Sequence, residues 1–246
     1  MHITSRDNPK IKEIALLQKS AAARREAGLL VCEGPVLLLE ALRSGLAPRS
    51  LFVLEGHTGA LPDGLACDIH TVTAPVMAKM QNTVTGAPLL FTVPIPEAKA
   101  PDQGPILALD GIADPGNLGT ILRTADALGG TVALLPDGAD PTAPKVVRAA
   151  MGALFRYFPW VCGYAALEAH CKAKGIPLYA AALRADAEDV RQVPLQGACI
   201  LIGNEAHGVS REGLDICQKS VIIPMRGAES LNAAAAAAIL LWEALT

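Results

Sequence analysis

The chain has 246 residues, of which 51% are hydrophobic and 18% are charged, and its formal net charge is −3 at pH 7. This hydrophobic fraction supplies a core for one large domain or two modest ones and excludes a globally disordered chain. Aromatic residues make up only 4%, so base stacking on aromatic platforms is not expected. Because the net charge is negative, any surface that binds nucleic acid must be a local basic one.

The cysteines and the apolar segments indicate the compartment. The six cysteines show neither a CxxC pair nor a zinc-ligand spacing, which predicts buried free thiols in a reducing cytosol and no metal site. The N-terminal segment has no apolar signal core, and no uninterrupted apolar stretch is long enough to span a bilayer. We therefore expect a cytoplasmic protein that has no membrane partner.

The first part of the chain alternates helix and strand signals. The first thirty residues are locally basic, and Ile11, Ile14 and Leu17 recur on one face of a helix. Strands are predicted at 29–34, 50–55, 67–72 and 88–93, and helices at 35–45 and within 72–83. Prolines then interrupt the pattern at positions 94, 96, 101 and 105. Because proline withholds backbone donors and disfavours helix before it, we predict a first domain over 1–96 and a linker over 97–105.

The second part, residues 106–246, alternates again. Strands are predicted at 106–110, 131–135, 177–182, 198–203 and 220–224. Helices are predicted at 117–128, 144–155, 164–174, 210–216 and 230–245. The strands are short continuous apolar runs, which are typical of a parallel sheet that is covered on both faces. The alanine run at 233–238 has strong helix propensity, and its smooth surface would also let another backbone approach closely.

Polar residues gather where three of these strands run into loops. The loops are DPGNLGT at 114–120, GNEAHG at 203–208 and IPMRGAESLN at 223–232. Since the carboxyl ends of parallel strands meet at one edge of a sheet, the three loops predict one composite ligand pocket.

The first of these loops has several interpretations. A glycine-containing loop before a helix suits an anionic group, and Asp137 follows the next strand where a dinucleotide fold places its ribose-binding acid. However, the loop is not G-x-G-x-x-G, Pro115 lies inside it, and Asp137-Gly138 is more simply a turn. On the helix that follows, Arg123 is either a solvated arginine or a phosphate clamp.

The second and third loops carry their own candidates. Glu205 directly follows a buried strand, so its carboxylate must be paired, either in a functional site or as a loop-ordering group. His207 is a possible general base, but an exposed loop histidine is the simpler interpretation. Asn232 at the start of the last helix is either a helix cap or a contact to substrate or to the Glu205 loop.

In this order, the segments DPGNLGTILRTADALGG, LIGNEAHGVS and IPMRGAESLN resemble the SpoU/TrmH family of RNA ribose 2′-O-methyltransferases within the SPOUT superfamily. The N-terminal segment DNPKIKEIALLQKSAAARREAGLLVCEG is similar to the substrate-binding domain of many such enzymes, a small α/β unit like a ribosomal-protein fold. The resemblance covers about residues 4–245. It implies a parallel α/β catalytic domain with a C-terminal trefoil knot, S-adenosylmethionine as cofactor, RNA as substrate and a homodimer formed through the knot region.

The resemblance also implies roles for particular residues. The positions that match the catalytic motifs are Asn117, Arg123, Glu205 and Asn232. The positions expected at the cofactor are Gly203, Asn204, Ile223, Met225 and Leu231. The cations expected to contact RNA are Arg6, Lys10, Lys12, Arg24, Arg25 and Arg148. Arg123 would hold the phosphate beside the target ribose, while Asn117 and Glu205 would fix Arg123 and the loops.

Two positions depart from the family pattern, because Ala150 and Ala234 stand where serine is usual. The lost hydroxyls leave the Asn, Arg and Glu set intact. Ribosomal RNA of the large subunit is favoured over transfer RNA as the substrate, because an N-terminal domain of this type precedes the catalytic domain. A non-catalytic RNA-binding or ribosome-assembly protein and a nicotinamide-dependent oxidoreductase remain as alternatives.

Overall fold

The computed structural model describes residues 1–82, 86–226 and 230–246, which divide into two compact units. The first unit comprises Met1–Pro96 and Thr142–Arg156, and the second comprises Glu97–Pro141 and Tyr157–Thr246. Each unit has its own hydrophobic core. The segment 142–156 packs in the first unit, although the sequence places it in the middle of the second domain.

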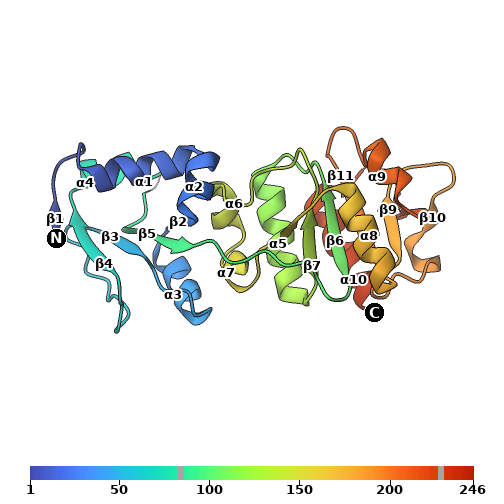
Figure 1. Ribbon diagram of the computed structural model, residues 1–246, viewed down its shortest axis with the longest axis horizontal. Coiled ribbons are helices and arrows are strands. Elements are labelled where there is room, and N and C mark those ends of the chain that lie inside the picture. Colours follow the sequence, from blue (N-terminus) through green and yellow to red (C-terminus); the bar gives the residue numbers. More distant parts are fainter. Residues whose placement is uncertain (83–85, 227–229) are drawn as a thin grey trace. The chain divides into compact units, whose positions relative to one another are not determined.

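The described residues of the first unit form a five-stranded sheet in the order β1-β4-β3-β5-β2 (Figure 1). The strands are β1 (His2–Ile3), β2 (Leu29–Glu33), β3 (Ser50–Leu54), β4 (Asp68–Val72) and β5 (Leu89–Pro94). Strand β5 is antiparallel to both of its neighbours, and the other pairs are parallel. The four strands that the sequence predicted here are confirmed, while β1, with only two residues, was too short to give a pattern.

Helices cover this sheet and supply much of its core. They are α1 (Pro9–Lys19), α2 (Ala21–Ala27), α3 (Pro35–Arg43), α4 (Ala74–Met80), α6 (Pro144–Ala149) and α7 (Ala153–Arg156). The side chain of Asn8 caps α1 by accepting from the backbone N–H of Lys10 at 3.0 Å. The expected apolar face of α1, with Ile11, Ile14 and Leu17, is buried in the core of the unit.

The helix predicted over 144–155 is broken in the middle. Met151 and Gly152 both have positive φ, +48° and +95°, so the chain leaves the helical region between α6 and α7. Val146 and Val147 of α6 are buried, and α6 packs against β2. The burial of these apolar side chains is the reason that the segment belongs to the first unit.

The described residues of the second unit form a seven-stranded parallel sheet in the order β10-β12-β9-β11-β6-β7-β8. The strands are β6 (Ile106–Asp110), β7 (Thr131–Leu134), β8 (Trp160–Val161), β9 (Leu178–Ala181), β10 (Glu188–Asp189), β11 (Cys199–Gly203) and β12 (Lys219–Ile222). The five strands predicted here are confirmed, and the two-residue strands β8 and β10 were not predicted. The parallel α/β class expected from the sequence is therefore correct.

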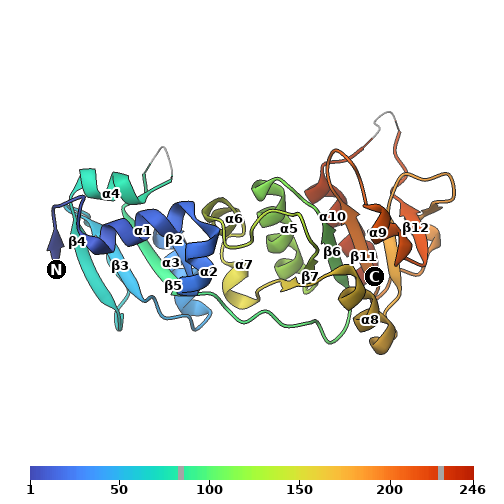
Figure 2. The same cartoon turned by 45° about the horizontal axis from the view of Figure 1, so that its top comes forward.

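Both faces of this sheet are covered by helices. The helices are α5 (Pro115–Leu128), α8 (Tyr164–Lys174), α9 (Arg211–Asp215) and α10 (Ala233–Leu245), with a 3₁₀ turn at Val190–Gln192. Leu167 and Cys171 of α8 share a core cluster with Ile106, Ala108 and Leu201 of the sheet. Helix α10 packs against α5 and touches β6 and β11, and it lies behind the sheet when α8 is in front (Figures 1 and 2).

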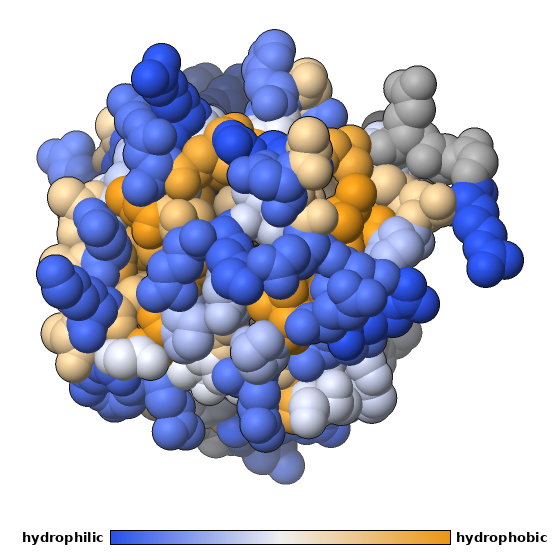
Figure 3. Space-filling view, turned by 90° about the vertical axis from the view of Figure 1, so that its right-hand side faces the viewer, coloured by the Kyte–Doolittle hydropathy of each residue, from blue (hydrophilic) through white to orange (hydrophobic). Residues whose placement is uncertain are grey.

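Charged side chains cover the edge of the sheet that ends in β10. Lys219 pairs with Glu188 at 2.7 Å, and Arg191 pairs with Asp189. The corresponding face of the second unit is mostly hydrophilic (Figure 3). Charges on an edge strand discourage pairing with a foreign strand.

Among the described residues, we find neither a helix with the length and apolarity needed to cross a membrane nor a His, Cys, Asp or Glu cluster suited to a metal ion.

Candidate active site

The loop between β6 and α5 is built by a tight turn and a helix cap. Gly111 follows β6 with φ +70°, a conformation that glycine adopts without strain. The Asp114 carboxylate then accepts from the backbone N–H of Asn117 at 2.9 Å and so caps α5. The turn and the cap lead the chain from strand β6 into α5 and place Asn117 in the first turn of the helix.

The loop after β11 is closed on itself and tied to the first loop. The backbones of Asn204 and Gly208 exchange two hydrogen bonds, at 3.0 and 2.8 Å. The side-chain amide of Asn204 donates to the Gly111 carbonyl at 2.8 Å, and its oxygen accepts from the backbone N–H of Ala206 and His207. The side chain of Asn204, which was expected at the cofactor, is therefore occupied in ordering this loop.

Three polar side chains link the three loops. The Asn117 amide nitrogen donates to Glu205 Oε1 at 2.8 Å, and the Asn232 amide nitrogen donates to Asn117 Oδ1 at 3.0 Å. The Asn232 oxygen accepts from the backbone N–H of Ala234 at 2.9 Å, so Asn232 also caps α10. The three loops that the sequence predicted to share one site therefore meet, and the interpretation of Asn232 as a cap is correct. Its amide contacts Asn117 of the first loop and not the Glu205 loop, and a contact to substrate stays a prediction.

The Glu205 carboxylate lies at the N-terminal end of α5. It accepts from the backbone N–H of Ala113 at 3.3 Å as well as from Asn117. Partial burial acts to raise the pKa of Glu205, but the hydrogen bonds from Asn117 and from backbone N–H groups outweigh it and hold the pKa below its usual range. The loop that the sequence marked as favourable to an anion is therefore served by a carboxylate of the protein itself.

Arg123 lies on α5, six residues after Asn117, and its side chain is exposed. Among the described residues it has no hydrogen bond or ion pair, so Asn117 and Glu205 hold one another and do not hold Arg123. Its guanidinium remains available to a ligand. The partners that the sequence analysis assigned to Arg123 are not found, and its role as a phosphate clamp stays a prediction.

The residues expected at the cofactor lie at or beyond the carboxyl ends of the strands. Gly203 ends β11, and a Cβ there would meet the carbonyl carbon of Gly208 at 2.0 Å, so no larger residue fits. Ile223 and Met225 follow β12 and are half-buried, while Leu231, before α10, is 39% exposed. Leu183, which the sequence analysis did not single out, follows β9, the strand between β11 and β12, and is 63% exposed. Its position after a strand of the same edge makes it a further candidate.

Four further expectations have structural outcomes. Asp137 has φ +65° and lies in a turn, as the simpler interpretation held, and the exposed side chain of His207 likewise favours an ordinary loop histidine. Ala234 is 8% exposed and gives only its backbone N–H to Asn232. Ala150 is fully buried in the first unit, where a serine hydroxyl would need a partner.

The cations expected to contact RNA all belong to the first unit, and most are accessible. Arg6, Lys12 and Arg25 are exposed. Lys10 pairs with Asp68 at 3.0 Å, and Arg148 lies half-buried beside Glu33 and Val147.

Arg24 is different, because only 4% of it is exposed. Its Nε donates to Thr142 Oγ1 at 2.9 Å, and its Nη1 donates to the Leu17 carbonyl at 2.7 Å. This burial contradicts the expectation that Arg24 contacts RNA. Successive helical residues point about 100° apart, so Arg24 and Arg25 face opposite environments although they are neighbours in the sequence.

Comparison with known proteins identifies the architecture that carries this site. A model of the SpoU rRNA Methylase family matches residues 104–242. The chain belongs to the SpoU rRNA methylase family. A second family model, the MRM3-like substrate binding domain, matches residues 8–90. Together the two matches span both units, and the first of them contains all three loops of the site.

The similarity to individual rRNA methyltransferases covers nearly the whole chain. The 23S rRNA (guanosine(2553)-2′-O)-methyltransferase RlmP of Bacillus subtilis is 31% identical over 98% of this chain and 97% of its own. The mitochondrial rRNA methyltransferase 3 of Mus musculus is 28% identical over 95% of this chain and 71% of its own. The crystal structure of an AdoMet-bound rRNA methyltransferase from Sinorhizobium meliloti, 28% identical, superposes with a TM-score of 0.86 over 99% of this chain and 97% of its own.

The site residues suit the cofactor that SpoU methylases use, S-adenosylmethionine. The loops at this edge present exposed large apolar side chains, Leu183 and Leu231. Apolar surface of this kind with a few polar groups is typical of a pocket for a nucleoside-containing ligand. The trefoil knot expected for the family stays a prediction.

Proposed function

We propose that the protein methylates a ribose 2′-hydroxyl of 23S ribosomal RNA, with its first unit binding the RNA and its second unit performing catalysis. The observation that carries this proposal is the match of both units to relatives that are named as rRNA methyltransferases. The tRNA (guanosine(18)-2′-O)-methyltransferase of Thermus thermophilus, by contrast, is 36% identical over only 55% of the chain. A ribosomal substrate implies that the protein works in the cytoplasm.

The cofactor supplies an electrophilic methyl group on a sulfonium centre. Gly203, Ile223 and Leu231 would hold it, and Met225 and Leu183 would add apolar contacts at the same edge. Asn204 contributes by ordering the loop that follows Gly203, because its side chain already has three partners.

Arg123 is the group that would act on the RNA. A guanidinium offers a planar fork of donors that matches a phosphate. Bound to the phosphate beside the target ribose, Arg123 orients the 2′-hydroxyl and stabilises negative charge that develops on it. A guanidinium keeps its proton in proteins, so Arg123 serves for positioning and electrostatics and not as a general base.

Glu205 is poorly suited to be the general base. Hydrogen bonds from Asn117 and Ala113 occupy its oxygens, and its lowered pKa makes it a weak proton acceptor near neutral pH. The chain of hydrogen bonds from Asn232 to Asn117 and from Asn117 to Glu205 therefore fixes the loops that shape the site.

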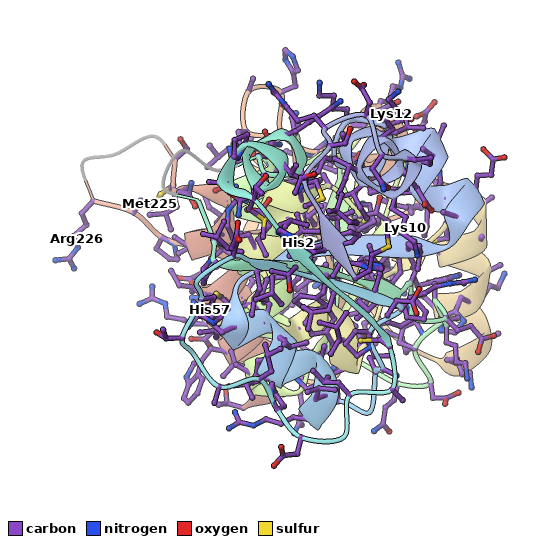
Figure 4. All side chains as sticks on the ribbon, turned by 90° about the vertical axis from the view of Figure 1, so that its left-hand side faces the viewer. His2, Lys10, Lys12, His57, Met225 and Arg226 are labelled. Atoms are coloured by element: carbon purple, nitrogen blue, oxygen red, sulfur yellow. The ribbon has the colours of Figure 1, made fainter. Side chains whose placement is uncertain are left out.

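A basic cluster on the first unit would contact the RNA backbone. The cluster is formed by Arg6, Lys12 and Lys79 around the carboxylate of Asp7. Lys12 pairs with Asp7 at 3.2 Å, and the Lys79 ammonium donates to the Arg6 carbonyl at 2.8 Å. Lys12, then Lys79 and Arg6, lower the pKa of the Asp7 carboxyl, which reports their combined positive potential. Lys10 and Lys12 both extend from α1 (Figure 4).

Such a cluster makes RNA binding sensitive to salt, because phosphate contacts release counterions. Replacing Lys12 and Lys79 together by alanine should lower RNA affinity and reduce the slope of log affinity against log salt by about 2. An unchanged slope would show that Lys12 and Lys79 do not contact the RNA backbone. Filter binding at several salt concentrations measures this.

Helix α10 would mediate a homodimer. Ile239, Trp242 and Leu245 recur at helical spacing and are 38%, 58% and 36% exposed, and they form an apolar stripe on the side of α10 away from the core. An apolar stripe of this kind marks a protein interface. Light scattering should show a dimer for the natural protein and a monomer for Trp242→Glu; a monomeric natural protein would refute the assignment.

The decisive experiment uses purified protein, isotopically labelled S-adenosylmethionine and separate pools of 23S rRNA and tRNA. Mass spectrometry after digestion to nucleosides should find a labelled 2′-O-methylnucleoside in the 23S rRNA. Label in tRNA alone would refute the ribosomal assignment. No label with intact cofactor binding would leave an RNA-binding role.

The role of Arg123 is tested in the same assay with Arg123→Ala and, as a control, Arg49→Ala, which replaces an exposed arginine of the first unit and should leave kcat unchanged. Arg123→Ala should lower kcat by about 100-fold or more, as for the loss of one electrostatic group at a reacting centre. Calorimetric affinity for S-adenosylmethionine should be unchanged. Equal loss of catalysis and cofactor binding would contradict the assignment.

A further inference from the structure

Asp110 places a buried carboxyl group at the carboxyl end of β6 in the second unit. Asp110 ends β6, and only 4% of it is exposed. The Tyr164 hydroxyl donates to Oδ1 at 2.6 Å, and the backbone N–H of Ser210 donates to Oδ2 at 2.7 Å. The Ser210 hydroxyl in turn donates to the Tyr164 oxygen at 3.2 Å. A buried carboxylate is tolerated only with such partners, so the arrangement of the three residues is strongly specified.

These bonds join the ends of the loop that carries Glu205. The loop begins at Asn204, whose amide is bonded to the Gly111 carbonyl, and it finishes at Ser210, whose N–H is bonded to Asp110. Asp110 and Gly111 are consecutive, so one dipeptide at the end of β6 holds both ends of the loop. Because the same chain continues into α5, this dipeptide also fixes the loop relative to Asn117.

Helix α9 packs closely against the carboxylate. A Cβ at Gly213 in α9 would lie 2.7 Å from Asp110 Oδ2, so glycine is needed for the short helix to approach. The Ser210 hydroxyl accepts from the Gly213 N–H at 3.0 Å and caps that helix. Burial, followed by the hydrogen bond to Asp110, raises the pKa of Tyr164, which keeps its hydroxyl protonated as the donor.

We infer that Asp110 and Tyr164 are positioning residues for methyl transfer: they clamp the loop 204–210 so that Glu205 meets Asn117 at the start of α5. This inference rests on the proposed function. The pair acts on the chemistry through Glu205 and touches neither substrate nor cofactor. Loss of the clamp leaves the first unit and its RNA contacts intact.

The test compares Tyr164→Phe with Tyr179→Phe, which removes a hydroxyl from β9 in the same sheet and serves as the matched control. Hydrogen exchange of the backbone amides of residues 203–211 should be at least about tenfold faster in Tyr164→Phe, as for a lost hydrogen bond to a charged group. Tyr179→Phe should exchange like the natural protein. Unchanged exchange in Tyr164→Phe would overturn the clamp even if the protein methylates no RNA.

Methylation kinetics then test the route through Glu205. Tyr164→Phe should lower kcat about tenfold with little change in KM for RNA, and it should lower kcat no further in a Glu205→Ala background. If the two losses in kcat multiply, Tyr164 acts independently of Glu205 and the inference is wrong. Asp110→Asn is the second variant: it keeps the shape of the side chain, and it should match Tyr164→Phe in both readouts.

Discussion

The buried guanidinium of Arg24 allows a prediction that separates a structural arginine from an RNA-binding one. Arg24→Met keeps much of the length and apolar volume of the side chain but removes the donors to Thr142 and to the Leu17 carbonyl. A hydrogen bond from a charged donor contributes about 1.5–3 kcal/mol. The Leu17 carbonyl lies in the last turn of α1, where helix carbonyls have no partner within the helix.

Two such bonds amount to about 3–6 kcal/mol. Methionine recovers part of this, because it carries no buried charge that must be desolvated. We expect a loss of about 3 kcal/mol in the free energy of unfolding of the first unit. Such a loss should release the segment 142–156 first, because Thr142 begins it.

Urea unfolding and hydrogen exchange of residues 142–156 measure this loss, and Arg25→Met is the matched control. Arg25 is exposed, so its replacement should change stability by less than about 0.5 kcal/mol while lowering RNA affinity. The reasoning would be refuted if Arg24→Met were as stable as the natural protein and lowered RNA affinity as Arg25→Met does.

Three other substitutions have expected outcomes. Gly203→Ala forces a Cβ against the backbone of Gly208. It should lower the free energy of unfolding by about 1–3 kcal/mol and weaken the binding of S-adenosylmethionine measured by calorimetry. Gly163→Ala is the control, because Gly163 has open space around it, and it should change neither quantity. Asp114→Ala removes the cap of α5 and should lower the free energy of unfolding by about 1 kcal/mol in urea titrations; no change would show that the cap is dispensable. His70 is buried without a partner for its ring nitrogens among the described residues, and burial lowers its pKa. The free energy of unfolding is therefore not reduced by His70 above the ordinary histidine pKa of about 6.5, and it decreases as the pH falls from there toward the lowered pKa. Replacing His70 by phenylalanine should flatten this pH dependence. Parallel curves of unfolding free energy against pH for the two proteins would contradict the prediction.

The regular elements could be predicted because their signals are local. Strands β6 and β11 are continuous apolar runs bounded by turn residues, and the structure forms them at Ile106–Asp110 and Cys199–Gly203. The predicted helix over 144–155 failed at Met151, because nothing in a run of ordinary helix formers announces a positive φ. Strands β1, β8 and β10 were missed because two residues cannot show a period of two.

The residues of the site could be predicted from the sequence, but their hydrogen bonds could not. The sequence predicted that Asn117, Glu205 and Asn232 lie at one edge of the sheet, because the carboxyl ends of parallel strands share that edge. It could not show that Asn117 and Glu205 bond each other and leave Arg123 free, since hydrogen bonds depend on distances of a few ångströms between loops that are distant in the chain.

The sequence by itself determined the class of fold, the three loops of the site and the family, because apolar periodicity and short motifs are written along the chain. Only the tertiary structure decided that the segment 142–156 packs with the first unit, that Arg24 is buried while Arg25 is exposed, and that Asp110 holds both ends of the Glu205 loop. Each of these depends on which side chains are taken out of water and which partners they meet there. Burial and partner choice are properties of the packed chain, and no local pattern encodes them.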